Sequence, residues 1–406
     1  MSTPSLADFA EEARAFLSEH ATPRRAEGAV VWGEGPDRVT YFGDEPKEVD
    51  RANVQAARDW QRTRYENGLG WITGPKQYGG RELSIAHELV YDGLEAEYDV
   101  PDTGVISLIG LGMIAPTMLA HARPEINDRY LPAMFRGDAI ACQLFSEPNA
   151  GSDLANVQTR ATRDGDSWLL NGQKVWTSAA HHAQLGMVVS RTNPDVPKHK
   201  GITTFLIDMS WEGVDVRPLR QMSGGAEFNE VYLDNVRVPD EHRMGEVDGG
   251  WRVTMTTLMN ERASVGGEGA GPATRPTSRA YLLEMLKATG RDTDGGVRRD
   301  FARLLADQTA TDYLTHQMMR RARTGDLPGP EASVGKLMFG QNLTRAAHLA
   351  AEMTGPRMLA DTGDWGAFSW NELLLGTPAF RILGGTEEIM KNILGERVLG
   401  LPKEPA

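Results

Sequence analysis

The sequence predicts an α+β protein with a helical N-terminal region, a β-rich middle region and a helical C-terminal region. Residues 1–139 carry the apolar and charge spacing of helices, and this spacing returns after Gly249-Gly250. Between them, residues 140–245 contain successive short runs rich in Val, Ile, Phe and Thr, which favour strands. Because no helical segment separates these runs, we expect an antiparallel β-barrel or sandwich rather than a parallel sheet. The chain of 406 residues is long enough for two or three domains, and we place them at 1–139, 140–245 and 246–406.

The N-terminal region is predicted to consist of helices joined by loops. An acidic amphipathic helix within residues 1–20 has one apolar side, made by Leu6, Phe9, Ala13, Phe16 and Leu17. Helical charge patterns follow at residues 48–65 and 85–97. A loop-rich stretch is expected near residues 31–46. The longest uncharged run, residues 104–120, contains several polar or helix-breaking residues, so we expect a buried helix rather than a membrane span.

One glycine pattern in this run, Gly110-Leu-Gly112-Met-Ile-Ala115, matches the pattern of dinucleotide-binding folds. That motif requires a strand before it, a helix that opens at it and a βαβ unit around it. Here the flanking segments are predicted to be helical and no alternation of strands and helices follows. We therefore interpret these glycines as positions of close helix packing.

The middle and C-terminal regions show clear element boundaries. Hairpin turns are expected at residues 163–166 and at Asn171-Gly172. Strands are expected at residues 157–162, 167–170, 175–178, 185–191, 202–209, 214–219 and 230–238. Helices are expected at residues 251–263, 298–323, 332–353 and 388–399.

Composition and charge argue against several classes of function. The chain has 43 Lys and Arg against 56 Asp and Glu, a formal net charge of −13, which argues against binding to nucleic acid or to an anionic membrane surface. A single cysteine, Cys142, excludes an internal disulfide and a zinc site built from cysteines. Residues 1–20 show no basic segment followed by an apolar signal core, so we expect a cytoplasmic protein without membrane insertion.

The histidines give no reason to expect a metal site. His181-His182 is the only close pair among the nine histidines, and adjacent positions do not face one ligand in a regular helix or strand. The metalloprotease pattern H-E-x-x-H and the hydrolase pattern G-x-S-x-G are both absent. We therefore expect neither a bound metal nor a serine-hydrolase triad.

Two segments carry residue types that bind a flat or anionic ligand. Residues 144–153, Leu-Phe-Ser-Glu-Pro-Asn-Ala-Gly-Ser-Asp, combine small residues with hydroxyls, which let backbone N–H groups approach a ligand. Residues 172–178, Gly-Gln-Lys-Val-Trp-Thr-Ser, place a tryptophan beside two hydroxyls at the end of a predicted strand. Taken alone, each segment is better explained as a turn or as a core tryptophan.

Taken together, the two segments resemble the signature of the acyl-CoA dehydrogenase family, S-E-P-x-A-G-S-D followed along the chain by N-G-x-K-x-W-x-[ST]. Further landmarks match in order: Tyr78-Gly79-Gly80, residues 236–239 (Val-Arg-Val-Pro), Arg262 after an acidic residue, and residues 384–389 (Gly-Gly-Thr-Glu-Glu-Ile). The resemblance extends over nearly the whole chain. It implies an α–β–α subunit with a C-terminal four-helix bundle and a non-covalently bound FAD.

The resemblance also implies roles for individual residues. Ser146 and Ser178 would hydrogen-bond the flavin ring with Trp176 packed beside it, and Ser152 would lie near the pyrophosphate. Arg291 would reach the FAD phosphates of a neighbouring subunit, a task that suits a permanently charged guanidinium. The residues expected to hold FAD are Leu144, Ser146, Gly151, Ser152, Trp176, Thr177, Ser178, Arg291, Glu352, Gly355, Gly385, Thr386 and Glu388. At Glu352 the family often has Gln, and a carboxylate is less favourable near phosphates.

The catalytic base departs from the commonest pattern of the family. Many members carry a Glu immediately before the late Gly-Thr, where this chain has Gly384. Relatives of the isovaleryl and long-chain type place the base on the first C-terminal helix just before an Arg, and Glu261-Arg262 matches that position. We therefore expect Glu261 to remove the α-proton of the substrate. Two alternatives remain open: a non-catalytic subunit that pairs with an active partner, and another chemistry such as nitroalkane oxidation, for which relatives use Asp.

The resemblance implies an acyl-CoA substrate, contacted by Ser152, Gly384 and Arg262, the last of these at the CoA moiety. Glycines at positions 266, 267, 269 and 271 fit a simple helix stop, and they also fit a roomy pocket for a branched or bulky acyl group such as a steroid side chain. The family further implies a homotetramer or dimer, with a heterotetramer as the alternative. An electron-transfer flavoprotein is the expected electron acceptor.

Overall fold

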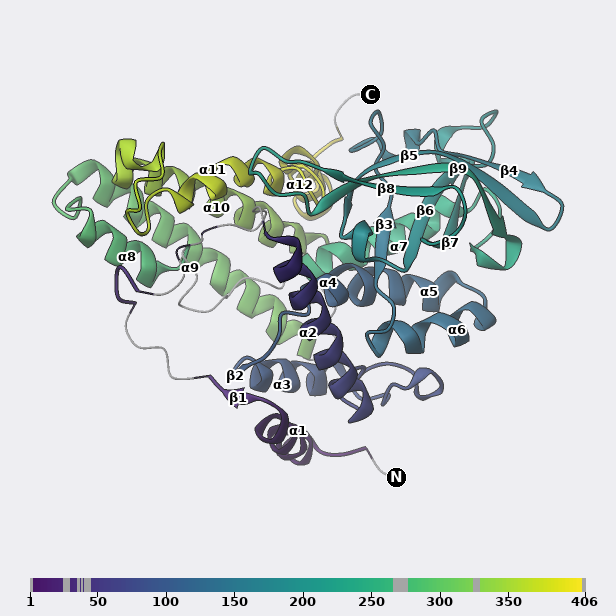
Figure 1. Cartoon of the computed structure of the whole chain (residues 1–406), viewed down its shortest axis with the longest axis horizontal. Helices are drawn as coiled ribbons and strands as arrows, with labels where there is room; N and C mark the ends of the chain where they lie inside the picture. Colours follow the sequence, from purple (N-terminus) through teal and green to yellow (C-terminus); the bar gives the residue numbers. More distant parts are fainter. Residues whose placement is uncertain are drawn as a thin grey trace. The chain divides into compact units, whose positions relative to one another are not determined.

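The computed structural model describes residues 3–24, 30–34, 37, 39, 45–265, 277–323 and 329–403. The chain forms two compact units. The first contains Met1–Pro23, Glu45–Arg220 and Ala226–Ser264, and the second contains Arg24–Asp44, Gln221–Gly225 and Val265–Ala406. Helices precede and follow a central sheet along the chain, which confirms the predicted α+β class (Figure 1). The two units group the N-terminal helices with the sheet, so they do not test the boundaries expected after residues 139 and 245. Those boundaries stay a prediction.

The first helices of the first unit pack through the apolar side that the sequence predicts. The helices are α1 (Leu6–His20), α2 (Lys47–Glu66) and α3 (Ile85–Glu95). Phe9 and Leu17 of α1 are fully buried and share one core cluster with Trp60 of α2 and Tyr91 of α3, whereas Leu6 is exposed. Burial of these large side chains is the main stabilising contribution in this layer.

The uncharged run forms a helical stretch from Gly104 to His121, made of α4 (Gly104–Ile106), a π-helical segment η2 (Ser107–Ile114) and α5 (Ala115–His121). Among the described residues it is the one helix long and apolar enough to cross a membrane, by length and composition only. Ile114 and Met118 are fully buried in a core cluster shared with α6 (Pro124–Phe135), so packing within this unit accounts for part of the apolar composition. No described strand leads into the glycine pattern, which excludes the dinucleotide-binding interpretation.

The central sheet has the strand order β10-β7-β6-β4-β5-β9-β8, with β3 beside β6. Its pairs are antiparallel, as predicted, except that β3 pairs with β6 in parallel and β4 meets β6 in one parallel contact. The strands are β3 (Ala141–Leu144), β4 (Arg160–Asp164), β5 (Ser167–Ser178), β6 (Leu185–Arg191), β7 (Ile202–Asp208), β8 (Val214–Leu219), β9 (Phe228–Pro239) and β10 (Arg243–Met244).

The predicted turn at Asn171-Gly172 is wrong, because β5 continues through this position with a β-bulge opposite β9. The side chain of Asn171 donates to Asn235 Oδ1 at 3.2 Å and accepts from the backbone N–H of Asn235 at 2.9 Å. A side chain at position 172 would place its Cβ 2.7 Å from the Cα of Thr159. The Asn-Gly pair therefore serves close strand packing at a bulge, rather than a hairpin turn.

The helices of the second unit are α8 (Arg279–Ala288), α9 (Gly295–Arg323), α10 (Ser333–Thr354), α11 (Ser369–Phe380) and α12 (Glu387–Ile393), which continues as a π-helical turn, Leu394–Val398. Trp370 is fully buried in a core that α8, α9, α10 and α11 share. From the predicted loop near residues 31–46, Trp32 packs against Tyr281 and Trp365, with ring centroids 5.7 and 5.0 Å away. Tyr41-Phe42 lies outside the described residues.

Candidate flavin and acyl-CoA site

A buried ion pair fastens the segment 144–153 to strand β5. Lys174 is fully buried, and its Nζ donates to Glu147 Oε1 at 2.7 Å. The same ammonium donates to the carbonyls of Phe145 (3.1 Å) and Val189 (2.7 Å), so all three of its donors are used. Burial lowers the pKa of Lys174 to about 8, against the opposing effect of the Glu147 charge.

Glu147 closes a tight turn in the same segment. Its backbone N–H donates to the carbonyl of Ala150 at 2.9 Å, and the reverse bond measures 3.1 Å. Its carboxylate accepts the backbone N–H groups of Gln158 and Thr159 at 2.6 and 2.9 Å. Burial raises the pKa of Glu147, but the Lys174 charge and these hydrogen bonds outweigh it, so the pKa lies below its ordinary value. A carboxylate held this way positions the loop and is not available as a base.

The two predicted motif segments lie side by side, because Val175 N–H donates to the carbonyl of Ser146 at 2.9 Å. The next residue, Trp176, has φ +59° at a second bulge of β5, and 57% of its surface is exposed. A left-handed backbone is rare for a bulky side chain and costs free energy. The conformation that projects this indole outward therefore lowers the stability of the strand.

Several residues near Trp176 in the sequence are those that the resemblance predicts to contact a flavin ring. Ser146, which pairs with Val175, and Ser178 at the end of β5 are half-buried. The hydroxyl of Thr177 is buried and has no hydrogen-bond partner among the described residues, so this residue presents no side-chain donor at the surface beside Trp176. Gly151 and Ser152 are exposed, whereas Leu144 is fully buried in β3 and offers a ligand only its backbone.

Glu261 lies near the end of α7 (Gly250–Val265), in the first unit. One helical turn earlier, Thr257 is buried, and its Oγ1 lies 3.1 Å from Thr117 Oγ1 of α5. Because residues four apart share a helix face, half-buried Glu261 lies on the side of α7 that packs toward the Gly104–His121 stretch. The side chain of Arg262 and the glycines at 266, 267, 269 and 271 lie outside the described residues.

In the second unit, the structure brings together Arg291 and Glu352, two residues predicted to hold FAD. Arg291 Nη2 donates to the carbonyl of Glu352 at 3.3 Å, and Nη1 pairs with Asp294 Oδ2 at 3.1 Å. The Glu352 carboxylate itself is exposed. Gly355 follows with φ +56°, a conformation that favours glycine at the end of α10.

The late glycine motif forms the start of α12 in the same unit. Gly384 and Gly385 have φ +64° and +97°, and Thr386 caps the helix by accepting the N–H of Ile389. Glu388 is exposed in the first turn, whereas the N–H groups of Glu387 and Ile389 donate to the carbonyl of Arg381 and to the hydroxyl of Thr386. The buried Lys336 donates to the carbonyl of Gly385 and so fixes this turn.

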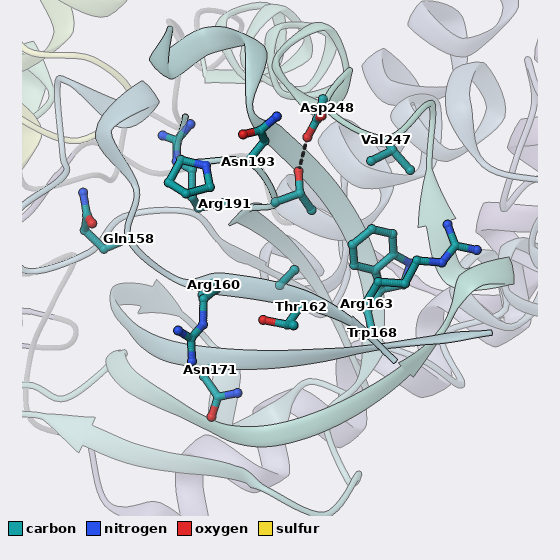
Figure 2. A pocket seen from close by; sticks show the side chains of 13 residues that line it. Gln158, Arg160, Thr162, Arg163, Trp168, Asn171, Arg191, Asn193, Val247 and Asp248 are labelled. Atoms are coloured by element: carbon teal, nitrogen blue, oxygen red, sulfur yellow. Dashed lines mark hydrogen bonds between the residues drawn. The ribbon is translucent and has the colours of Figure 1, made fainter. Parts of the chain in front are cut away.

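A separate groove of about 850 Å³ lies in the first unit among β4, β5 and the loop after β6 (Figure 2). No predicted FAD or substrate residue is among those that line it. The guanidinium of Arg191 donates hydrogen bonds to the carbonyls of Ala155 and Lys198, and Arg163 lies over the ring of Trp168. These arginines therefore hold loops in place and do not converge on one ligand.

Sequence reasoning missed the roles of Lys174 and Lys336. Lys174 was visible within the second motif, but nothing in its spacing indicates burial or a partner 27 residues away. Lys336 has no sequence signal at all, since it lies in an ordinary helical pattern of α10.

Comparison with known proteins defines the class. Models of the N-terminal, middle and C-terminal domains of acyl-CoA dehydrogenases match residues 3–138, 142–236 and 248–399. The chain belongs to the acyl-CoA dehydrogenase family, which confirms the predicted resemblance. Members of this family are FAD-dependent oxidoreductases, and FAD is the cofactor.

The chain is similar to several particular members. It is 42% identical to the acyl-CoA dehydrogenase FadE34 of Mycobacterium tuberculosis (strain ATCC 25618 / H37Rv) over 81% of this chain but only 44% of FadE34, so it spans less than half of that relative. It is 36% identical to the acyl-CoA dehydrogenase IpdE1 of the same organism over 98% of both chains. The solved structure of "Tcur3481-Tcur3483 steroid ACAD" superposes with a TM-score of 0.73 at 26% identity, covering 100% of this chain and 99% of that chain.

Proposed function

We propose that this protein dehydrogenates an acyl-CoA thioester to the 2,3-enoyl-CoA, with Glu261 as the base. A thioester α-proton is weakly acidic, so a carboxylate must lie against the α-carbon and away from bulk water, where its basicity rises. The observation that carries the proposal is the half-buried place of Glu261 on α7, one turn after the Thr257–Thr117 contact. FAD, when bound, supplies the acceptor for the hydride that leaves the β-carbon.

Residues proposed to hold FAD occur in both units. In the first unit, Ser146 and Ser178 supply hydroxyls to the flavin, Trp176 packs beside it, and the exposed loop at Gly151-Ser152 approaches its phosphates. The second unit contributes Arg291, Glu352, Gly355, Gly385, Thr386 and Glu388. The charge of Arg291 serves phosphate binding, since its ion pair with Asp294 is half-exposed and easily exchanged for a phosphate.

The proposed substrate is a bulky acyl-CoA of the steroid side-chain type. The solved structure at a TM-score of 0.73 is described as a steroid acyl-CoA dehydrogenase, which supports this class. Gly384 supports it as well, because a position without a side chain leaves more room beside the acyl group. Arg262 would pair with a phosphate of CoA, and Ser152 would contact the same moiety.

A second candidate function is a non-catalytic FAD-binding subunit that pairs with an active sister chain. The observation that favours it is Gly384, which stands where many relatives carry the base. The name of the solved steroid relative also joins two proteins, so assembly from two kinds of chain is the alternative to a homotetramer or dimer. Either form would pass electrons to an electron-transfer flavoprotein in the cytoplasm.

The deciding experiment is an anaerobic titration of the FAD-loaded protein with straight, branched and steroid-derived acyl-CoAs, followed by flavin absorbance. Bleaching by the steroid-derived class is the expected result. Glu261→Gln should bind FAD and acyl-CoA but abolish bleaching, because the amide accepts no proton. Near-normal bleaching by Glu261→Gln would exclude Glu261 as the base. Absence of bleaching with every acyl-CoA would favour the non-catalytic subunit.

A further inference from the structure

Three side chains outside the flavin-binding residues converge within the first unit. His181 and His182 lie on a short 3-10 turn, η4 (Ala180–His182), directly after β5, and Asp50 lies in the first turn of α2. Nε2 of His182 lies 2.9 Å from Asp50 Oδ2, and Nε2 of His181 lies 3.8 Å from the same oxygen. One ligand atom from each residue lies within 4.8 Å of the other two.

The expectation that these adjacent histidines face apart is wrong. It assumed a regular helix or strand, whereas the chain here makes a single tight turn after Ala179, whose φ is +54°. The turn brings the two imidazole rings to a centroid distance of 4.0 Å with a tilt of 49°. Both rings therefore reach the same carboxylate of α2.

We propose that Asp50, His181 and His182 bind one divalent transition-metal ion, for which Zn²⁺ is the best chemical match. With metal–ligand bonds of about 2.0–2.1 Å, ligand atoms of a tetrahedral site lie about 3.3 Å apart. The two His–Asp50 separations of 2.9 and 3.8 Å bracket this value, and the two histidine ligand atoms lie within 4.8 Å of each other. Two imidazole nitrogens and one carboxylate oxygen suit Zn²⁺, and water completes the fourth position.

The state of the ligand atoms favours a metal. Nε2 of His182 is buried and has no hydrogen bond of acceptable geometry among the described residues, although it lies close to Asp50. Side-chain exposures of 36% for His181 and 35% for Asp50 leave a path for an ion from solvent.

A residue behind the cluster couples it to the flavin-binding strand. Nδ2 of Asn229 lies 3.0 Å from Nδ1 of His181 and donates to the carbonyl of Thr177 at 3.1 Å. A metal on Nε2 places the imidazole proton on Nδ1. Rotation of the Asn229 amide then presents to this proton its Oδ1, which is buried without a partner among the described residues. The rotation breaks the hydrogen bond from Asn229 to the carbonyl of Thr177, and this loss lowers the affinity for the metal.

The test is a titration of the FAD-loaded protein with ZnCl₂ by calorimetry and with CoCl₂ by visible absorption. The expected result is one ion per chain and tetrahedral Co²⁺ bands at longer wavelengths than the flavin bands. Asp50→Asn and His182→Ala should each weaken binding by more than the roughly 10–100-fold that loss of an outer-shell partner causes. The control His20→Ala, which removes an exposed histidine of α1 outside the cluster, should bind as the wild type does.

Three outcomes would overturn the proposal: no stoichiometric ion on the wild type, unchanged affinity in Asp50→Asn, or an equal loss in His20→Ala. Far-UV circular dichroism and FAD content establish that each variant is folded. If His182→Ala does not fold, Asp50→Asn still decides, because it is isosteric and lies at a half-exposed position of the first turn of α2.

Discussion

Lys174 Nζ lies 2.7 Å from Glu147 Oε1, and the two side chains are 0% and 5% exposed. This pair joins the two segments whose residues are proposed to hold the flavin, one that follows β3 and one within β5. A fully buried ammonium is tolerated only because its three donors meet a carboxylate and two carbonyls. The Lys and the Glu of the two motifs therefore form one structural unit, and we expect them to be substituted only together.

Lys174→Met should destabilise the FAD-loaded protein by about 3–5 kcal/mol, because it leaves the Glu147 carboxylate buried without its counter-charge. Urea unfolding followed by circular dichroism measures this loss. The matched control is Lys198→Met, which breaks an exposed ion pair with Asp153 and should cost less than about 1 kcal/mol. Equal losses of stability in the two variants would show that the buried Lys174–Glu147 pair stabilises the protein no more than an exposed ion pair does.

The hydrogen bonds that Asp240 accepts predict how the stability of the folded protein depends on pH. Hydrogen bonds from Arg243 (Nε, 2.9 Å) and from Trp168 (Nε1, 2.9 Å) hold the pKa of Asp240 well below its ordinary value. The unfolded chain therefore binds a proton at a higher pH than the folded protein does. The stabilisation is complete above the ordinary pKa of about 3.9 and is lost as pH falls below it.

Wild-type stability, measured by urea unfolding between pH 7 and pH 3, should accordingly fall at the acidic end. Asp240→Asn should lower stability at pH 7 and flatten this dependence, because the variant has no proton to gain at this position. An unchanged slope in Asp240→Asn would mean that other carboxylates control acid unfolding.

Periodicity predicted much of the fold but little of what fixes the site. The strands at 185–191 and 214–219 match the prediction to the residue: the first is a buried apolar run, and in the second half-buried and exposed residues alternate over its first four positions. Asn171-Gly172 misled because the same dipeptide serves a turn or a bulge, and only the cross-strand partner Asn235 decides between them. Asp50 and His182 come together across 132 residues, and no local pattern encodes such a contact.

Gly172→Ala should destabilise the protein by about 1–3 kcal/mol, since its Cβ would lie 2.7 Å from the Cα of Thr159, a backbone atom that cannot turn aside. Thermal unfolding of the two proteins measures the difference. The control is Gly93→Ala, an open position within α3, which should stabilise by about 0.5–1 kcal/mol. A tolerated Gly172→Ala would mean that the strands separate at the bulge at little cost.

Trp176→Gly should separate stability from flavin binding. Trp176 has φ +59°, and 57% of its surface is exposed. Packing of the indole within the protein therefore offsets little of the backbone strain. Glycine relieves about 1–3 kcal/mol of strain and loses about 0.4–1 kcal/mol through the freer unfolded chain, so the FAD-free protein should unfold at the same or higher urea concentration. FAD affinity should nevertheless fall about tenfold, which corresponds to the roughly 1.4 kcal/mol of a lost aromatic contact. Fluorescence titration with FAD measures this affinity. A variant that loses stability without FAD and binds FAD normally would show that the indole serves the strand and not the cofactor.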